Sequence, residues 1–220
     1  MDKEEFLKRL DEDEEFSPGW QAIDDVFDSL YPRQKPAHFG TNMVNRAIFG
    51  GDEYLDGYSF YTSNKGYKHL VTYGMTVLYG DEEAFGGEWN GWGYEMTMKL
   101  KEDDVQDCMW AVSLLSNFAR YTYKTNNFFQ PNQYVISKNI LAQLGVESDI
   151  IAFLLVEDTE AHATESVYGK TEFIQLVGIT EKEFEAVQKD LDNMKRIIQK
   201  MKEDGNVDLV TDMKRTKSYL

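Results

Sequence analysis

The chain has 220 residues, of which 42% are hydrophobic and 14% aromatic, enough apolar material for one large domain with a real core. Its 39 acidic and 23 basic side chains give a formal net charge of −16. This balance argues against nucleic acid or an anionic membrane as the main partner, because basic groups supply most of the affinity for both. It favours a basic protein partner, or it serves only solubility.

The N-terminal segment is highly charged, since residues 1–15 hold eight acidic and three basic side chains. With few apolar positions, residues 1–16 are predicted to be a charged tail or a frayed helix ahead of a domain spanning 17–220. Ser17 and Pro18 then predict a helix start, because serine is a good N-cap and proline fits the first helical position. Apolar residues at helical spacing continue this helix to Leu30.

Between residues 38 and 100 the apolar period changes to two, which predicts strands at 58–61, 69–77 and 94–100. In the last of these, four apolar residues on one face alternate with Glu95, Thr97 and Lys99 on the other. Turns are predicted at glycines and at an Asn-Gly pair, namely at Gly50-Gly51, Gly66, Gly86-Gly87 and Asn90-Gly91. The region is therefore predicted to form a mainly antiparallel, meander-like sheet.

The second half of the chain alternates between helical and strand patterns. Helical spacing predicts a helix from about 105 to 125, with Cys108 as a small core residue. Strands are predicted at Tyr134–Ile136, 150–156, 172–177 and Val207–Val210. Thr180 to Glu183 predicts a capping box, which starts one helix that continues to near Gly205. Together these elements predict a single α+β domain with a mixed, largely antiparallel sheet flanked by helices.

The sequence contains few residues typical of a catalytic or metal site. The three histidines stand in different segments, and no cysteine or histidine pair has zinc-ligand spacing. Glu157, Asp158 and His162 are the one candidate metal set, but a solvated loop explains them better. The sequence therefore predicts no catalytic residue, no metal and no cofactor. A metal-dependent hydrolase stays the weakest functional hypothesis.

The compartment follows from the cysteine count and from the hydrophobic pattern. A single cysteine cannot form an internal disulfide, which fits a reducing compartment. The N-terminus lacks the pattern of a secretory signal, and the longest aliphatic run, 150–156, is far shorter than a membrane helix. We therefore expect a cytoplasmic protein.

Aromatic residues in predicted turns, including Phe128 and Phe129, are candidate anchors for a protein interface.

Several short segments together resemble the suppressor of fused domain family, and they occur in the order of that family from residue 18 to the C-terminus. They are Pro18-Gly19 with Leu30-Tyr31-Pro32, Leu55-Asp56 with Ser59 and Tyr61, Leu78-Tyr79-Gly80, Gly93 to Leu100, Ala119-Arg120-Tyr121 with Asn127 and Phe129, Leu154-Leu155 with Glu157-Asp158, Phe173 to Gly178, and Thr211 to Arg215. The resemblance implies a non-enzymatic protein-binding domain of the single-domain bacterial type. For that type it implies an immunity protein that neutralises a toxin domain.

The resemblance also implies a partner-binding surface. Tyr121 matches a tyrosine of the peptide groove in the animal relatives, whereas Gln133 replaces a groove aspartate and departs from the pattern. The strand Tyr134, Val135 and Ile136 would offer an edge for strand addition. Alternatively, Tyr121 is a core residue. The competing functional hypothesis is a peptide-binding scaffold that acts by strand addition, as in the animal relatives.

Overall fold

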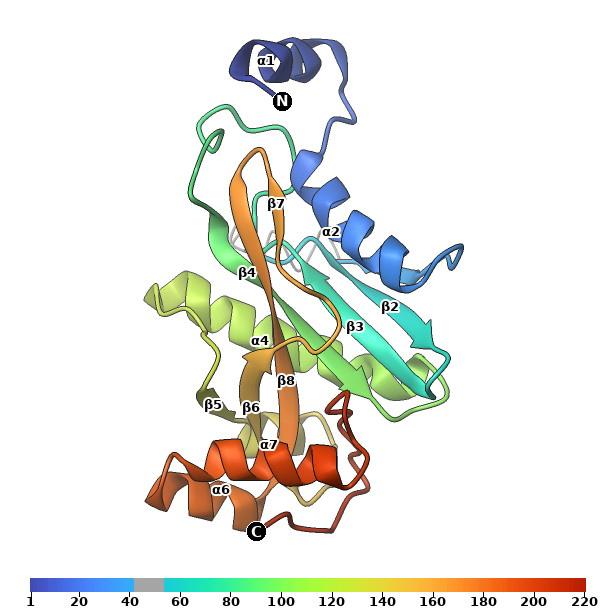
Figure 1. The fold of residues 1–220 in the computed structure, drawn as a ribbon, viewed down its shortest axis with the longest axis vertical. Helices are drawn as coiled ribbons and strands as arrows, with labels where there is room; N and C mark the ends of the chain where they lie inside the picture. Colours follow the sequence, from blue (N-terminus) through green and yellow to red (C-terminus); the bar gives the residue numbers. More distant parts are fainter. Residues whose placement is uncertain (42–53) are drawn as a thin grey trace.

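A mixed sheet forms the framework of the molecule (Figure 1). In the residues that the computed structural model describes, 1–41 and 54–220, the sheet has eight strands: β1 (Ala37–Gly40), β2 (Gly57–Ser63), β3 (Tyr67–Tyr73), β4 (Trp89–Leu100), β5 (Gln133–Ile136), β6 (Ile150–Glu157), β7 (Thr164–Ser166) and β8 (Gly169–Thr180). The strand order is β1-β2-β3-β4-β8-β6-β5, with β7 paired to β8. Every pairing is antiparallel except that of β4 with β8. The predicted α+β fold with a mixed, largely antiparallel sheet is confirmed.

Helices cover both faces of this sheet. In the same described ranges they are α1 (Lys3–Glu12), α2 (Pro18–Leu30), the 3-10 turn η1 (Gln106–Cys108), α4 (Met109–Thr125), α5 (Lys138–Gln143), α6 (Glu181–Lys189) and α7 (Asn193–Glu203). Helices α4 and α5 pack on one face, whereas α2, α6 and α7 pack on the other. The chain starts beside α1 at one end of the elongated molecule and finishes beside α6 and α7 at the other (Figure 1).

The alternation of side chains in β8 shows how the two faces are built. Ile174 and Leu176 join the core under α4, whereas Phe173 packs with α2 and Val177 packs with α6 and α7. Since successive side chains of a strand point to opposite faces, a strand covered on both sides buries residues of both parities. The same holds for β4, so Glu95, Thr97 and Lys99 on its second face are all buried.

Helix α1 lies in the segment predicted as a tail or a frayed helix. The Asp2 side chain accepts a hydrogen bond from the Glu5 amide and caps the helix. Phe6 is fully buried and packs against Phe16 and Tyr168. Phe6, with the partly buried Leu7 and Leu10 packed against the same cluster, therefore docks this charged helix onto the folded body.

The predicted turn at Asn90-Gly91 is wrong, because both residues lie inside β4. The Asn90 side chain accepts a hydrogen bond from the Val77 amide and donates one to the Val77 carbonyl, at 2.8 and 3.2 Å. Gly91 has φ of +55°, a conformation that favours glycine, and it lies between Trp89 and Tyr94, where the register between β4 and β8 shifts. The Asn-Gly pair makes an irregularity within the strand. Turns do form at Gly66 and Gly86.

The single helix predicted from residue 181 to near Gly205 is interrupted. The capping box at Thr180 and Glu183 is present, but α6 ends at Lys189 and α7 begins at Asn193. Asp190 is extended, and its side chain accepts a hydrogen bond from the Asp192 amide. Such a local bond competes with the helical pattern and explains the break.

Two predicted strands also differ from the structure, and one predicted turn lies outside the described residues. Residues 207–210 form no strand, because Leu209 is left-handed and the Asn206 side chain bonds both backbone groups of Val210. Strand β3 ends at Tyr73 rather than at residue 77. The predicted Gly50-Gly51 turn falls in residues 42–53.

The close approach of α2 to the segment after β3 depends on Gly19. A Cβ atom at this position would lie 1.8 Å from the Val77 carbonyl oxygen, which belongs to rigid backbone. We therefore expect Gly19→Ala to force α2 outward and to lower the free energy of unfolding by about 1–3 kcal/mol. Urea denaturation measures this effect. The control is Gly40→Ala, where a Cβ atom would have no neighbour within 4 Å; equal losses in the two variants would contradict the prediction.

Candidate functional site

The five residues predicted to bind a partner lie together along one groove. Tyr121 comes from α4, and Gln133, Tyr134, Val135 and Ile136 make up β5. The groove has a volume of about 830 Å³. Its remaining lining residues come from α4, from the loop that follows it, from α5 and from the link between α6 and α7; they are Asn117, Phe118, Asn126 to Gln130, Asn132, Ile140 and Leu191.

A stack of aromatic rings holds Tyr121 at the mouth of this groove. Its ring lies parallel to that of Phe129, with the ring centroids 5.9 Å apart, and Phe129 meets Phe118 edge to face at 5.7 Å. The Asn127 side chain donates a hydrogen bond to the Tyr121 hydroxyl. Tyr121 is 47% exposed, so it is not a core tyrosine. One face of its ring is packed, while the rest of the side chain is accessible to a partner.

The strand β5 supplies the other wall and a free backbone edge. It pairs with β6, and no described strand pairs with its opposite side. The Ser137 amide donates to the Ile151 carbonyl, which fixes the phase of the antiparallel ladder. Hydrogen-bonded pairs alternate in such a ladder, so the amide of Val135 faces β6, whereas those of Tyr134 and Ile136 face outward. An added strand would meet the latter two amides.

The lining of this groove is uncharged, although the chain as a whole is strongly acidic. It combines aromatic rings with the side-chain amides of asparagine and glutamine residues. Amides both donate and accept hydrogen bonds, so they suit the backbone of another chain, and aromatic rings supply large apolar contact areas. The groove therefore suits a peptide segment with apolar side chains.

The residues of the metal-site hypothesis do not form a site. Asp158 is buried in a cluster of ionic side chains, where it lies 2.9 Å from His69 Nε2 and 3.0 Å from Lys99 Nζ. Its other carboxylate contacts are the Thr97 hydroxyl and the amides of the turn that follows β6. Glu157 and His162 are exposed. Among the described residues, no group of three or more such side chains is placed to hold a metal ion.

Asp158 also corrects the prediction that this loop is solvated. Burial by itself would raise the pKa of the Asp158 carboxyl, but His69, Lys99 and the Thr97 hydroxyl together hold that pKa well below its usual range. The aspartate is therefore an ionised group that joins β3, β4 and the end of β6. Its role is to stabilise the fold.

Cys108 lies at the start of α4 and is fully buried, as the helical spacing predicts. Burial raises the pKa of its thiol to about 12, with nearby acidic side chains adding to the effect. The thiol therefore stays protonated and is a poor nucleophile.

None of the helices in the described ranges is both long enough and apolar enough to cross a membrane.

Sequence reasoning missed two asparagines that shape the groove. Asn126 caps α4 in a left-handed conformation with φ of +56°, and Asn132 precedes β5 with φ of +67°. They turn the chain at both ends of the loop that carries Phe128 and Phe129. The signal was present in the sequence, because asparagine is the residue other than glycine that most readily takes this conformation.

Fold and groove together define an α+β domain with an open strand edge beside an uncharged groove. The chain belongs to the suppressor of fused protein (SUFU) family, whose sequence profile it matches over residues 51–216. The suppressor of fused homologs of Homo sapiens and Mus musculus are each 28% identical to it over 212 residues. These matches cover 90% of this chain and 43% of each homolog, so the chain spans less than half the length of these relatives.

Solved structures share the fold. The chain in the Sufu-Fu complex crystal structure has a TM-score of 0.75 at 24% identity, with 92% of both chains covered. Drosophila Suppressor of Fused has a TM-score of 0.76 at 24% identity, covering 92% of this chain and 51% of that one. A SUFU homologue from Neisseria gonorrhoeae has a TM-score of 0.60 at 15% identity, with 92% and 97% covered.

Proposed function

We propose that this chain is a non-enzymatic binding protein that holds an extended segment of a partner protein as an added strand on β5. The observation that carries the proposal is the coincidence of a free strand edge with an uncharged groove of aromatic rings and amides. The edge would supply backbone hydrogen bonds, and the groove would receive alternate side chains of the bound segment. Membership of the SUFU family supports protein binding as the activity.

The partner that we propose is a toxin domain, which the chain neutralises as an immunity protein. This part rests on the resemblance to single-domain bacterial members of the family. The net charge of −16 would attract a basic toxin domain and speed the encounter, while the uncharged groove would make the close contacts. A cytoplasmic location is part of the proposal and rests on the lone cysteine.

The strand-addition step is tested by proline at Ile136. The Ile136 amide faces the open edge, so Ile136→Pro should leave the β5–β6 ladder intact and weaken partner binding about tenfold or more. Ile136→Val is the matched control, because valine keeps both the amide and the strand preference. Val135→Pro is unsuitable for this test, since that amide faces β6. Circular dichroism checks the fold, and isothermal titration calorimetry with the toxin domain encoded beside the gene measures the affinity.

The outcomes separate the two parts of the proposal. A complex that forms with unchanged affinity in Ile136→Pro rejects β5 as the contact edge but keeps the protein-binding role. Failure to bind or neutralise any toxin domain encoded beside the gene rejects the immunity role. Loss of binding in Tyr121→Ala with normal stability would support the groove, because this half-exposed ring is not needed for the core.

A further inference from the structure

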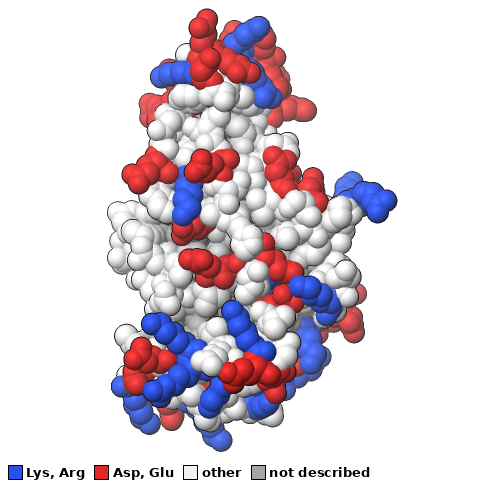
Figure 2. All heavy atoms as spheres, viewed as in Figure 1, with Lys and Arg blue, Asp and Glu red and all other residues white. Residues whose placement is uncertain are grey.

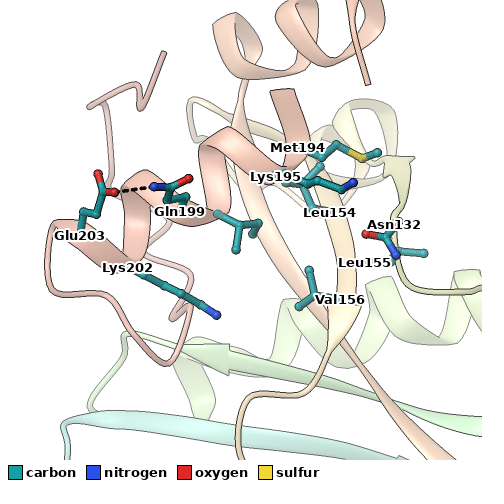
Figure 3. Close-up of a pocket in the computed structure, with 10 residues that line it drawn as sticks. Asn132, Leu154, Leu155, Val156, Met194, Lys195, Gln199, Lys202 and Glu203 are labelled. Atoms are coloured by element: carbon teal, nitrogen blue, oxygen red, sulfur yellow. Dashed lines mark hydrogen bonds between the residues drawn. The ribbon is translucent and has the colours of Figure 1, made fainter. Parts of the chain in front are cut away.

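A second groove lies between α7 and β6, and the proposed function does not use it (Figure 3). It has a volume of about 540 Å³. Leu154 and Val156 of β6 and Met194 and Ile198 of α7 give it an apolar lining. Met194 and Ile198 are four residues apart, about one helical turn, so they share one face of α7. Leu154 and Val156 are two residues apart, so they share one face of β6. The result is an apolar trough that runs beside α7.

Basic side chains border this trough. Lys195 and Lys202 are both exposed, line the groove and form no ion pair with any described residue. The one acidic residue of the rim, Glu203, accepts a hydrogen bond from the Gln199 side chain at 2.7 Å (Figure 3). Two helical turns separate the lysines, which places their Cα atoms about 10 Å apart along the helix. The rim therefore presents two cations, two helical turns apart, along the α7 side of the apolar floor.

The charge of this end of the molecule differs from that of the rest. Residues 181–220 contain nine acidic and nine basic side chains, so the whole net charge of −16 belongs to residues 1–180. Helix α7 alone carries four basic side chains and one acidic one. Figure 2 shows lysine and arginine side chains gathered at the end where α6 and α7 lie. An acidic ligand is thus repelled by most of the molecule but not by this end.

We propose that the groove between α7 and β6 binds a protein segment in which apolar side chains are flanked by aspartate or glutamate. Apolar side chains would cover the exposed parts of Met194 and Ile198, and carboxylates would pair with Lys195 and Lys202. This contact is separate from strand addition at β5 and uses the opposite charge preference from that of the acidic body. Asn132 borders both grooves, so one partner is able to reach the two surfaces together.

Fluorescence anisotropy with synthetic nonapeptides tests the site directly. The probe is a fluorescein-labelled peptide with three leucines flanked by glutamates, compared with versions carrying lysine for glutamate or serine for leucine. We expect the intact chain to bind the first peptide, and to bind each of the other two at least about tenfold more weakly. The double variant Lys195→Glu, Lys202→Glu should weaken binding of the first peptide by a similar factor.

The matched control is Arg196→Glu with Lys200→Glu, which makes the same charge change on the same helix at residues that do not line the groove. We expect this control to change the affinity much less than the groove variant. Equal weakening by the two double variants would show attraction to net charge alone and overturn the proposal. Equal binding of the leucine and serine peptides would overturn the apolar part. Ile136→Pro should bind the probe normally, so the result does not depend on the β5 edge.

Discussion

Replacing Asp158 by alanine should lower the free energy of unfolding by about 3–5 kcal/mol. The change removes the carboxylate that faces two buried groups, Lys99 Nζ at 3.0 Å and His69 Nε2 at 2.9 Å. Lys99 is fully buried and, among the residues that the structure describes, would keep only Glu160, at 3.2 Å, as an anionic partner. Removing one partner of a buried ion pair leaves the other charge buried without a sufficient counter-charge, which destabilises the fold more than replacing both partners by apolar residues.

Chemical denaturation at neutral pH measures this loss. The control is Asp212→Ala, because Asp212 forms an ion pair of 2.7 Å with the exposed Lys101 at the surface, where we expect less than about 1 kcal/mol. Adding Lys99→Met to Asp158→Ala should recover part of the loss, since the uncompensated charge is then gone as well. A loss below about 1 kcal/mol in Asp158→Ala would show that the buried cluster contributes little to stability.

The pH dependence of this contribution has a definite sign. The pKa of Asp158 is lowered in the folded state, so its stabilising effect is fully present above the pKa of the unfolded carboxyl. It is lost only as the pH falls below about 4. At neutral pH the contribution of the ionised Asp158 carboxyl should therefore be insensitive to small changes in pH.

Glu95 should give the opposite dependence, with the chain losing about 3 kcal/mol of stability between pH 4.5 and pH 8. Glu95 is fully buried in β4, and burial raises the pKa of its carboxyl to about 7. Hydrogen bonds from Thr72, Thr76 and Gly74 oppose this shift, at 2.6 to 3.0 Å. A carboxyl whose folded pKa exceeds its unfolded pKa stabilises the fold at low pH, and this contribution is lost as the pH rises through 7.

The measurement is urea denaturation of the intact chain and of Glu95→Gln from pH 4.5 to pH 8. Glutamine keeps the shape of the side chain and remains neutral at every pH. Glu95→Gln should therefore lack the part of the pH dependence that comes from Glu95, and at pH 8 it should be more stable than the intact chain. Glu165→Gln, at an exposed position, controls for the removal of one acidic side chain. A constant difference between Glu95→Gln and the intact chain across the pH range would refute the raised pKa.

Glu95 also connects stability to the shape of the segment after β3. Its carboxylate accepts hydrogen bonds from the Gly74 and Thr76 amides, so it holds the chain where β3 ends at Tyr73. The sequence pattern alone favours a strand through residue 77, because apolar residues continue at every second position. The strand stops earlier because the amides bond to a buried side chain instead of to a neighbouring strand.

Local signals explain which predictions succeeded. The start of α2, the capping box at Thr180 and the buried strand at 150–156 each depend on neighbours within a turn or a few residues. The predicted edge strand at Tyr134–Ile136 also forms, and it lies beside Tyr121 in one groove. Predictions failed where a polar side chain bonds nearby backbone, as Asn90 does to Val77 and Asp190 to the Asp192 amide.

The amino-acid sequence by itself determined the α+β class, most of the helices and strands, and the family to which the chain belongs. Periodicity, caps and ordered motifs carry that information within short stretches of chain. Only the tertiary structure decided that β4 pairs in parallel with β8, that Asp158 meets His69 and Lys99 in the interior, and that Lys195 and Lys202 border an apolar trough. The physical reason is that these features depend on contacts between distant residues or on the exposure of whole surfaces, and neither leaves a periodic signal in the sequence.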